Sequence, residues 1–118
     1  MKIAIPIDEN KTDVCEVFAR APYFLIYETE TETADIAENP AARAQGGAGL
    51  KAAQFVVDQN ANVLITKRCG ENAAEVLHAA EITIFKPEMK TAEENLSALK
   101  EKKLRELTHF HAGFHGVQ

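Results

Sequence analysis

The sequence predicts an α/β fold in which a mixed sheet of five strands carries helices on its faces. Residues 1–38 contain short apolar runs separated by polar turns, a pattern typical of an antiparallel meander. From residue 45 onward, helical and strand patterns alternate, which favours parallel strands joined by right-handed crossovers. The expected order along the chain is therefore β-β-β-α-β-α-β-α, and these units together form one mixed sheet.

Three strands are expected early in the chain, at residues 2–7, 23–27 and 33–38. The first alternates, with isoleucines on one face, and the second is an apolar, aromatic run. The third is weaker and ends at Asn39-Pro40. Polar residues 8–13 predict a loop after the first strand, and the segment that carries Cys15 and Arg20 is expected to be a short helical turn or an ordered loop.

A glycine-rich stretch, Gln45-Gly46-Gly47-Ala48-Gly49-Leu50, separates the meander from the alternating part of the chain. A helical pattern begins at once, with Leu50, Ala53 and Val57 on one face. The first N–H groups of a helix are unpaired and carry the positive end of the helix dipole, so this stretch suits an anion. Tight packing or an unusual backbone conformation explains the glycines equally well.

Two further strand–helix units complete the predicted fold. Short apolar runs at residues 63–66 and 82–85 predict buried strands, each followed by a helical pattern. Thr91 fits the N-cap position of the last helix because acidic residues follow it in the first turn. Leu104 and Leu107 either extend that helix or belong to a docked tail.

Open sheets of this type bind ligands beyond the carboxyl ends of their strands, at a topological switch point. The loop of residues 8–20 follows the first strand, and Cys69-Gly70 follows the fourth, so both lie at this edge. If the third strand runs parallel to the first, the glycine-rich stretch opens on the same edge. Three segments that are distant in the sequence then converge on one candidate site.

Length and composition limit the function classes. The 118 residues suit one domain, and we expect residues 1–107 to form it and residues 108–118 to be a flexible, histidine-containing tail. No apolar run approaches the roughly 20 residues of a membrane helix, and no signal-peptide pattern is visible, so we expect a cytoplasmic protein that binds no membrane. A net charge of −5, from 13 basic and 18 acidic residues, argues against nucleic-acid binding.

Cys15 and Cys69 are the candidate soft ligands. Cys69 is expected between a strand end and a helix start, beside Lys67 and Arg68, a setting that lowers the pKa of a thiol. Two thiolates together with backbone N–H groups suit an iron–sulfur species. Each cysteine is explained equally well as a small buried core residue.

Other charged and titratable groups give weaker signals. Arg20 either faces an anionic ligand or pairs with Asp13 or Glu16 at the surface. The tail holds three histidines, His109, His111 and His115. Short histidine-rich tracts bind metal ions such as nickel, zinc or copper, although a terminal tract that ligates nothing is the alternative.

Five motifs in order resemble those of one known family. They are Met1-Lys2-Ile3-Ala4-Ile5-Pro6, Phe18-Ala19-Arg20-Ala21-Pro22-Tyr23-Phe24, Asn39-Pro40, Gly46-Gly47-Ala48-Gly49 and Cys69-Gly70-Glu71-Asn72-Ala73. From residue 1 to about residue 105, the chain resembles the dinitrogenase iron–molybdenum cofactor-binding family, which includes small NifX-type proteins. The resemblance implies a ribonuclease H-like fold with strand order 3-2-1-4-5, and it implies binding of an iron–sulfur or iron–molybdenum cluster, or a precursor, in nitrogen-fixation-related cofactor assembly.

The leading hypothesis is therefore a non-enzymatic carrier that exchanges a metallocluster with donor and acceptor proteins, as a monomer or small homo-oligomer. The candidate cofactor-binding residues are Cys15, Arg20, Gln45, Gly46, Gly47, Gly49, Cys69 and Gly70. Family members often have a histidine in place of Gln45 and a proline in place of Glu71, which motivates a regulatory module that has lost its cluster. A thiol redox sensor is the third hypothesis. No triad, paired carboxylates or complete phosphate-binding loop points to an enzyme.

Overall fold

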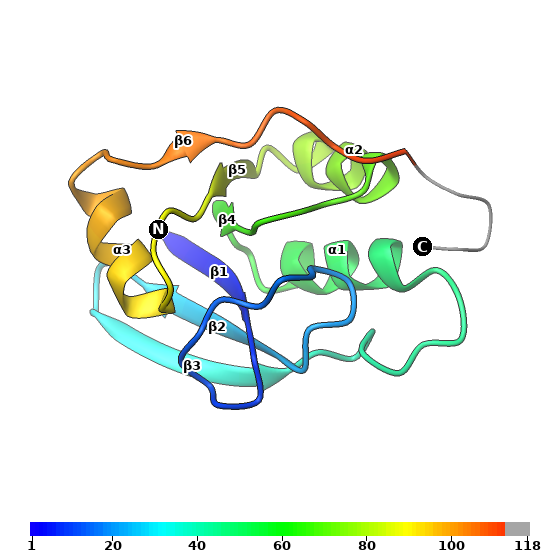
Figure 1. Ribbon diagram of the computed structural model, residues 1–118, viewed down its shortest axis with the longest axis horizontal. Helices are drawn as coiled ribbons and strands as arrows, with labels where there is room; N and C mark the ends of the chain where they lie inside the picture. The colour runs from blue at the N-terminus through cyan, green and yellow to red at the C-terminus, as the bar shows by residue number, and fades with distance from the viewer. Residues whose placement is uncertain (113–118) are drawn as a thin grey trace.

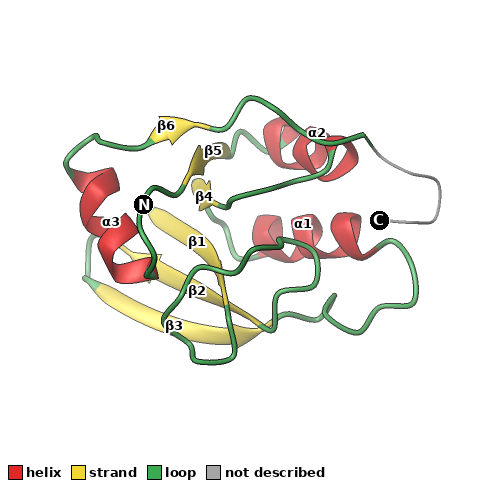
Figure 2. Ribbon diagram, in the orientation of Figure 1, coloured by secondary structure: helices red, strands yellow, loops and turns green. Residues whose placement is uncertain are grey.

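Strand β1 (Lys2–Ile7) lies at the centre of a six-stranded sheet in the computed structural model, which describes residues 1–112 (Figures 1 and 2). The sheet order is β3-β2-β1-β4-β5-β6. The other elements are β2 (Tyr23–Glu28), β3 (Thr33–Glu38), α1 (Ala48–Asp58), β4 (Val63–Ile65), α2 (Glu71–Ala79), β5 (Thr83–Lys86), α3 (Ala92–Lys100) and β6 (Arg105–Glu106).

Strand directions follow the expected mixed pattern. β1 pairs antiparallel with β2 and parallel with β4, β2 pairs antiparallel with β3, and β4 pairs parallel with β5. Two successive reversals make β3 parallel to β1, which confirms the condition for the glycine-rich stretch to open at the carboxyl edge. The predicted order of the first five strands is confirmed.

The predicted count of five strands is wrong, because β6 pairs antiparallel with β5 as a sixth strand. Both of its residues are exposed, so it carries no apolar pattern of its own. The leucines that flank it anchor it instead: Leu104 packs in the cluster on the α3 side of the sheet, and Leu107 in the cluster on the α1 and α2 side. Of the two alternatives for these leucines, the docked segment is the one observed.

Helices cover both faces of the sheet. α1 and α2 lie side by side over one face, where Phe24, Leu64 and Ile84 are fully buried (Figure 1). α3 lies over the other face, against the isoleucines of β1. Among residues 1–112, no helix is long and apolar enough to cross a membrane.

The predicted buried face of the first helix is wrong at one position. Leu50 is 47% exposed, and α1 instead buries Ala48, Ala52, Ala53 and Val56. The apolar spacing alone allows either set, and small alanines permit the close approach of α1 to the sheet and to α2. The predicted N-cap of α3 is confirmed, since Thr91 and Glu94 form a reciprocal capping box.

Candidate functional site

The carboxyl ends of β1, β3 and β4 lie at one edge of the sheet, and the three predicted segments meet there. Residues 8–20 form an ordered loop without a helix, which leaves and rejoins the sheet through an Ile7–Val14 bridge. Lys67 Nζ lies 3.3 Å from Glu16 Oε1 and so links this loop to the segment after β4. Both side chains are partly exposed, so the ion pair adds little stability but marks where the two segments touch.

Asn39 joins the first loop to the turn before the glycines, a role that the sequence pattern does not reveal. Its Nδ2 donates to the carbonyl oxygens of Ala19 and Ala21, each at 2.9 Å, and its Oδ1 accepts from Ala41 N at 2.9 Å. The side chain is 5% exposed, so these bonds are shielded from water. The only sequence signal is the Asn-Pro pair, which predicts a turn but not its partners.

Arg20 contacts the same turn. Within residues 1–112 it forms no ion pair with Asp13 or Glu16, so the predicted surface pairing is wrong, and its contact with an anionic ligand stays a prediction. Its Nη1 donates to the carbonyl oxygen of Ala44 at 2.8 Å and, more weakly, to that of Ala42 at 3.4 Å. The guanidinium therefore holds the backbone that leads into the glycine-rich stretch. Backbone acceptors leave no side-chain signal in a sequence, so this contact was not predictable from residue types.

The glycine-rich stretch begins α1 with a left-handed residue. Gly47 is the N-cap, with φ 65° and ψ 26°, and no side chain caps the helix. Gln45, Gly46 and Gly47 are exposed. A Cβ placed on Gly49 would lie 3.9 Å from Ala73 Cβ, so the first turns of α1 and α2 touch. The positive ends of two helix dipoles therefore lie together at this edge.

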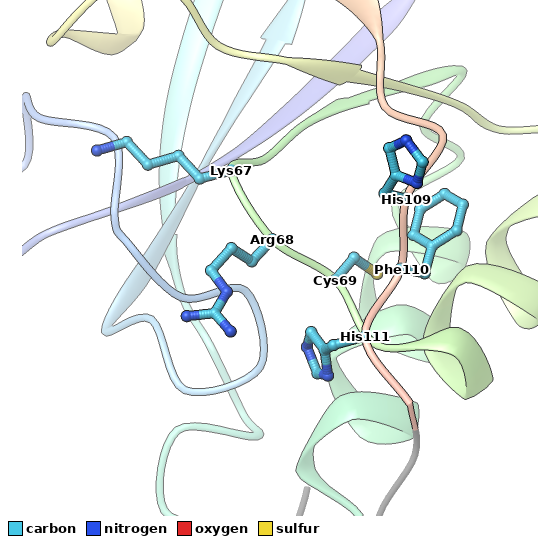
Figure 3. A pocket seen from close by; sticks show the side chains of 6 residues that line it. All are labelled: Lys67, Arg68, Cys69, His109, Phe110 and His111. Atoms are coloured by element: carbon cyan, nitrogen blue, oxygen red, sulfur yellow. The ribbon is translucent and has the colours of Figure 1, made fainter.

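Cys69 lies at the predicted position but in a different electrostatic environment. It is 2% exposed and belongs to the apolar cluster beneath α1 and α2. Burial raises the pKa of the Cys69 thiol to about 12, so the prediction of a lowered pKa is wrong. The neighbouring positive charges do not offset this rise in the pKa of Cys69, because Lys67 extends toward the first loop and Arg68 is exposed (Figure 3).

Cys15 is also buried, and its backbone N–H donates to the carbonyl oxygen of Pro6 at 2.9 Å. Burial is the main cause that raises the pKa of the Cys15 thiol, and contact with Asp8 adds to it. Both cysteines are free thiols. Within residues 1–112, no three His, Cys, Asp or Glu side chains form a group that could hold a metal ion.

The C-terminal segment, residues 108–112, runs along Cys69-Gly70 and past α2 (Figure 1). His111 N donates to the carbonyl oxygen of Cys69 at 3.3 Å, and Glu71 N donates to that of His111 at 2.9 Å. The Phe110 ring meets the His78 ring edge-on, with centroids 5.6 Å apart. His115 lies outside the described residues, and metal binding by the histidines stays a prediction.

A pocket of about 300 Å³ lies between this segment and the residues after β4 (Figure 3). It is lined by Lys67, Arg68, Cys69, His109, Phe110 and His111. Of the predicted site residues, the structure thus brings together Cys69, His109 and His111. Gln45 and the glycines lie at the N-terminus of α1, and Arg20 faces the turn before them.

Comparisons with known proteins agree with this architecture. The chain is similar to a NifB-type protein from Thermotoga, with 38% identity, a TM-score of 0.77, and coverage of 92% of this chain and 95% of the other. It is similar to the apo form of the orange protein from Desulfovibrio gigas, with 26% identity, a TM-score of 0.83, and coverage of 91% and 92%. A dinitrogenase-like protein from Methanocaldococcus jannaschii shares the fold at 20% identity, with a TM-score of 0.71 and coverage of 92% and 96%.

The comparison with curated proteins gives no match. The family model described as dinitrogenase iron-molybdenum cofactor matches residues 1–102, which include every segment of the sheet edge described above except the C-terminal one. The chain therefore belongs to the dinitrogenase iron-molybdenum cofactor family.

Proposed function

We propose that this protein is a non-enzymatic carrier that binds an iron–sulfur or iron–molybdenum cluster, or a precursor of one, as cargo during cofactor assembly. The observation that supports it most is the family match over residues 1–102, which covers the glycine-rich stretch and Cys69 together. The similarity to the NifB-type protein, at 38% identity, supports the same role. Its partners are the proteins that supply and receive the cluster.

The cargo site in this proposal is the edge where α1 and α2 begin. The exposed glycines leave room for a bulky guest, and the two helix N-termini offer N–H groups to the sulfides of an anionic cluster. Cys69 supplies a sulfur ligand, and coordination replaces its proton, so uptake releases protons. Because Cys69 is 2% exposed, the cargo reaches it only after side chains of the C-terminal segment move aside.

Anaerobic reconstitution tests the proposal. The protein is incubated with iron, sulfide and reductant, or with a purified cluster donor, and then desalted. We expect charge-transfer absorbance in the wild type and its loss in Cys69→Ala. Cys15→Ala tests whether the second predicted thiol ligand also contributes. A wild-type protein that stays colourless and retains no metal under both conditions would overturn the proposal.

A regulatory module without a cluster is the second candidate, and the burial of Cys69, which is 2% exposed, favours it. In that case the exposed Gln45 occupies a position where a metal ligand has been lost. Cluster uptake by Gln45→His but not by the wild type would support this candidate. Equal uptake by the two proteins would remove it. The redox-sensor hypothesis is disfavoured because burial raises the pKa of both thiols.

A further inference from the structure

The pocket between residues 67–69 and 109–111 differs in charge from the rest of the molecule. Four of its six lining side chains are basic or imidazole groups: Lys67, Arg68, His109 and His111. The other two are Cys69 and Phe110, so no carboxylate lines the pocket, although acidic residues outnumber basic ones by 18 to 13 in the chain. A positive concavity on an acidic protein concentrates anions at that one place.

Among residues 1–112, the side chains that line the pocket form no hydrogen bond or ion pair with one another. Figure 3 shows the Arg68 side chain and the His111 imidazole on the side of the C-terminal segment away from Phe110, with the Arg68 guanidinium extending away from the Cys69 sulfur. Extended backbone alternates its side chains, which places His109 on the same side as His111. Lys67 is directed toward Glu16 and forms an ion pair with it, so its charge is balanced and Arg68 carries the unpaired positive charge of the pocket.

Backbone hydrogen bonds hold this arrangement in register. Two hydrogen bonds form the Gly70–His111 bridge: His111 N donates to the carbonyl oxygen of Cys69, and Glu71 N donates to the carbonyl oxygen of His111. The first N–H of α2 is therefore already bound, and the pocket recognises a ligand through its side chains. Among the described residues, Arg68 forms no ion pair with a carboxylate, which leaves its charge for a ligand.

We propose that this pocket binds a small tetrahedral oxyanion, of which phosphate, sulfate and molybdate are the available kinds. A guanidinium offers parallel N–H donors that match two oxygens of such an anion, and each imidazole offers a further N–H. The volume of about 300 Å³ accommodates one such anion with bound water. His109 and His111 lie beyond residue 102, so half of the basic lining comes from outside the family match.

Titration calorimetry of the full chain with sodium phosphate, sulfate and molybdate, in metal-free buffer at constant ionic strength, tests the site. We expect saturable one-to-one binding of at least one of these anions, weakened about tenfold by Arg68→Gln and again by His109→Gln with His111→Gln. Lys100→Gln, which removes an exposed positive charge on α3 across the sheet, is the control and should change affinity by about twofold or less. Circular dichroism confirms that the variants fold.

Saturable binding of any one anion supports the proposal, and a preference among the three identifies which kind the site takes. Amide shifts in nuclear magnetic resonance spectra should be concentrated at residues 67–71 and 109–111. No saturable heat with all three anions would overturn the proposal, as would equal weakening by Arg68→Gln and Lys100→Gln. Arg68→Gln should weaken anion binding without abolishing cluster uptake, whereas Cys69→Ala should abolish cluster uptake, so the two proposals fail independently.

Discussion

Gly47 shows how a single residue controls the start of α1. Its φ of 65° lies in the left-handed region, which is unfavourable for a residue with a Cβ. An added Cβ meets no atom within 4 Å, so the cost of a side chain here comes from backbone strain alone. We expect Gly47→Ala to lower the free energy of unfolding by about 1–2 kcal/mol, measured by urea unfolding. Gly49→Ala is the control, because its new Cβ makes an ordinary 3.9 Å contact and alanine favours the helix by about 1 kcal/mol. Equal losses in both variants would contradict this account.

The buried thiol of Cys69 makes stability depend on pH in the alkaline range. Its pKa rises from 9.0 to about 12 on folding, so between these values the unfolded chain has lost a proton that the folded chain keeps. Stability from this group is complete below about pH 9 and falls as pH rises, by up to about 1.4 kcal/mol per pH unit. Urea unfolding at several pH values should show a steeper alkaline decline in the wild type than in Cys69→Ala. Parallel declines would show that the thiol ionises as easily in the folded state.

The position of Cys69 was predictable from the sequence, but its chemistry was not. A strand pattern that stops before Cys69-Gly70 indicates the sheet edge. The pKa depends on burial among α1, α2 and Phe110, which comes from chain about 40 residues away. Arg20 and Asn39 illustrate the same limit, since both donate to backbone carbonyl oxygens that any residue type supplies.

At the scale of single elements, α3 is fixed to the loop before it by one buried amide. Asn95 is 0% exposed, its Oδ1 accepts from Glu88 N and Met89 N, and its Nδ2 donates to the carbonyl oxygens of Met89 and Thr91. Removing it leaves partly buried backbone groups without partners. We therefore expect Asn95→Ala to cost about 2–4 kcal/mol, measured by thermal or urea unfolding.

Ser97→Ala is the matched control for that variant, because Ser97 is exposed on the same helix. It should change stability by about 0.5 kcal/mol or less. A loss in Asn95→Ala no larger than that of the control would show that water replaces the amide in the loop. The sequence pattern placed α3 and its N-cap correctly, yet Asn95 carries no signal that separates a buried bridge from a surface asparagine.

Apolar patterns and the polar turns between them made most elements predictable, including the largely exposed β3. β1 and β2 have long apolar runs and were predicted within a residue or so. β6 was not predicted, because it has only two residues and both are exposed. Its position in the sheet depends on Leu104 and Leu107, which flank it and are buried. α1 was predicted as a helix, but its buried face was not, because more than one face of an alanine-rich helix is apolar. Tertiary packing decides that Ala52 is buried and Leu50 is exposed.

At the scale of the whole molecule, the C-terminal segment packs beside Cys69. It closes over the thiol through the His111–Cys69 bond and the packing of Phe110 on the cluster that contains Cys69. We expect a chain that ends at Leu107 to alkylate Cys69 at least about tenfold faster than the full chain, as measured by mass spectrometry after iodoacetamide labelling.

Cys15 provides the internal control for that experiment, because it lies in the first loop and its labelling should stay slow in both proteins. The full-length variant Phe110→Ala should give an intermediate rate for Cys69. An unchanged Cys69 rate in the shortened chain would mean that the helices alone bury the thiol. Faster labelling of both cysteines would instead indicate general loosening of the fold.

The central position of β1 has a consequence for the protein during its synthesis. A nascent chain that has emerged as far as β3 can form the antiparallel meander, but one edge of β1 stays unpaired until Val63–Ile65 arrives to form β4. The isoleucines of β1, which lie on the face of the sheet that α3 later covers, stay exposed until α3 is made. Ribosome-bound chains therefore pass through a stage with an open, apolar sheet edge, at which pairing between neighbouring nascent chains competes with folding. The emergence of β4 and then of α3 ends that exposure.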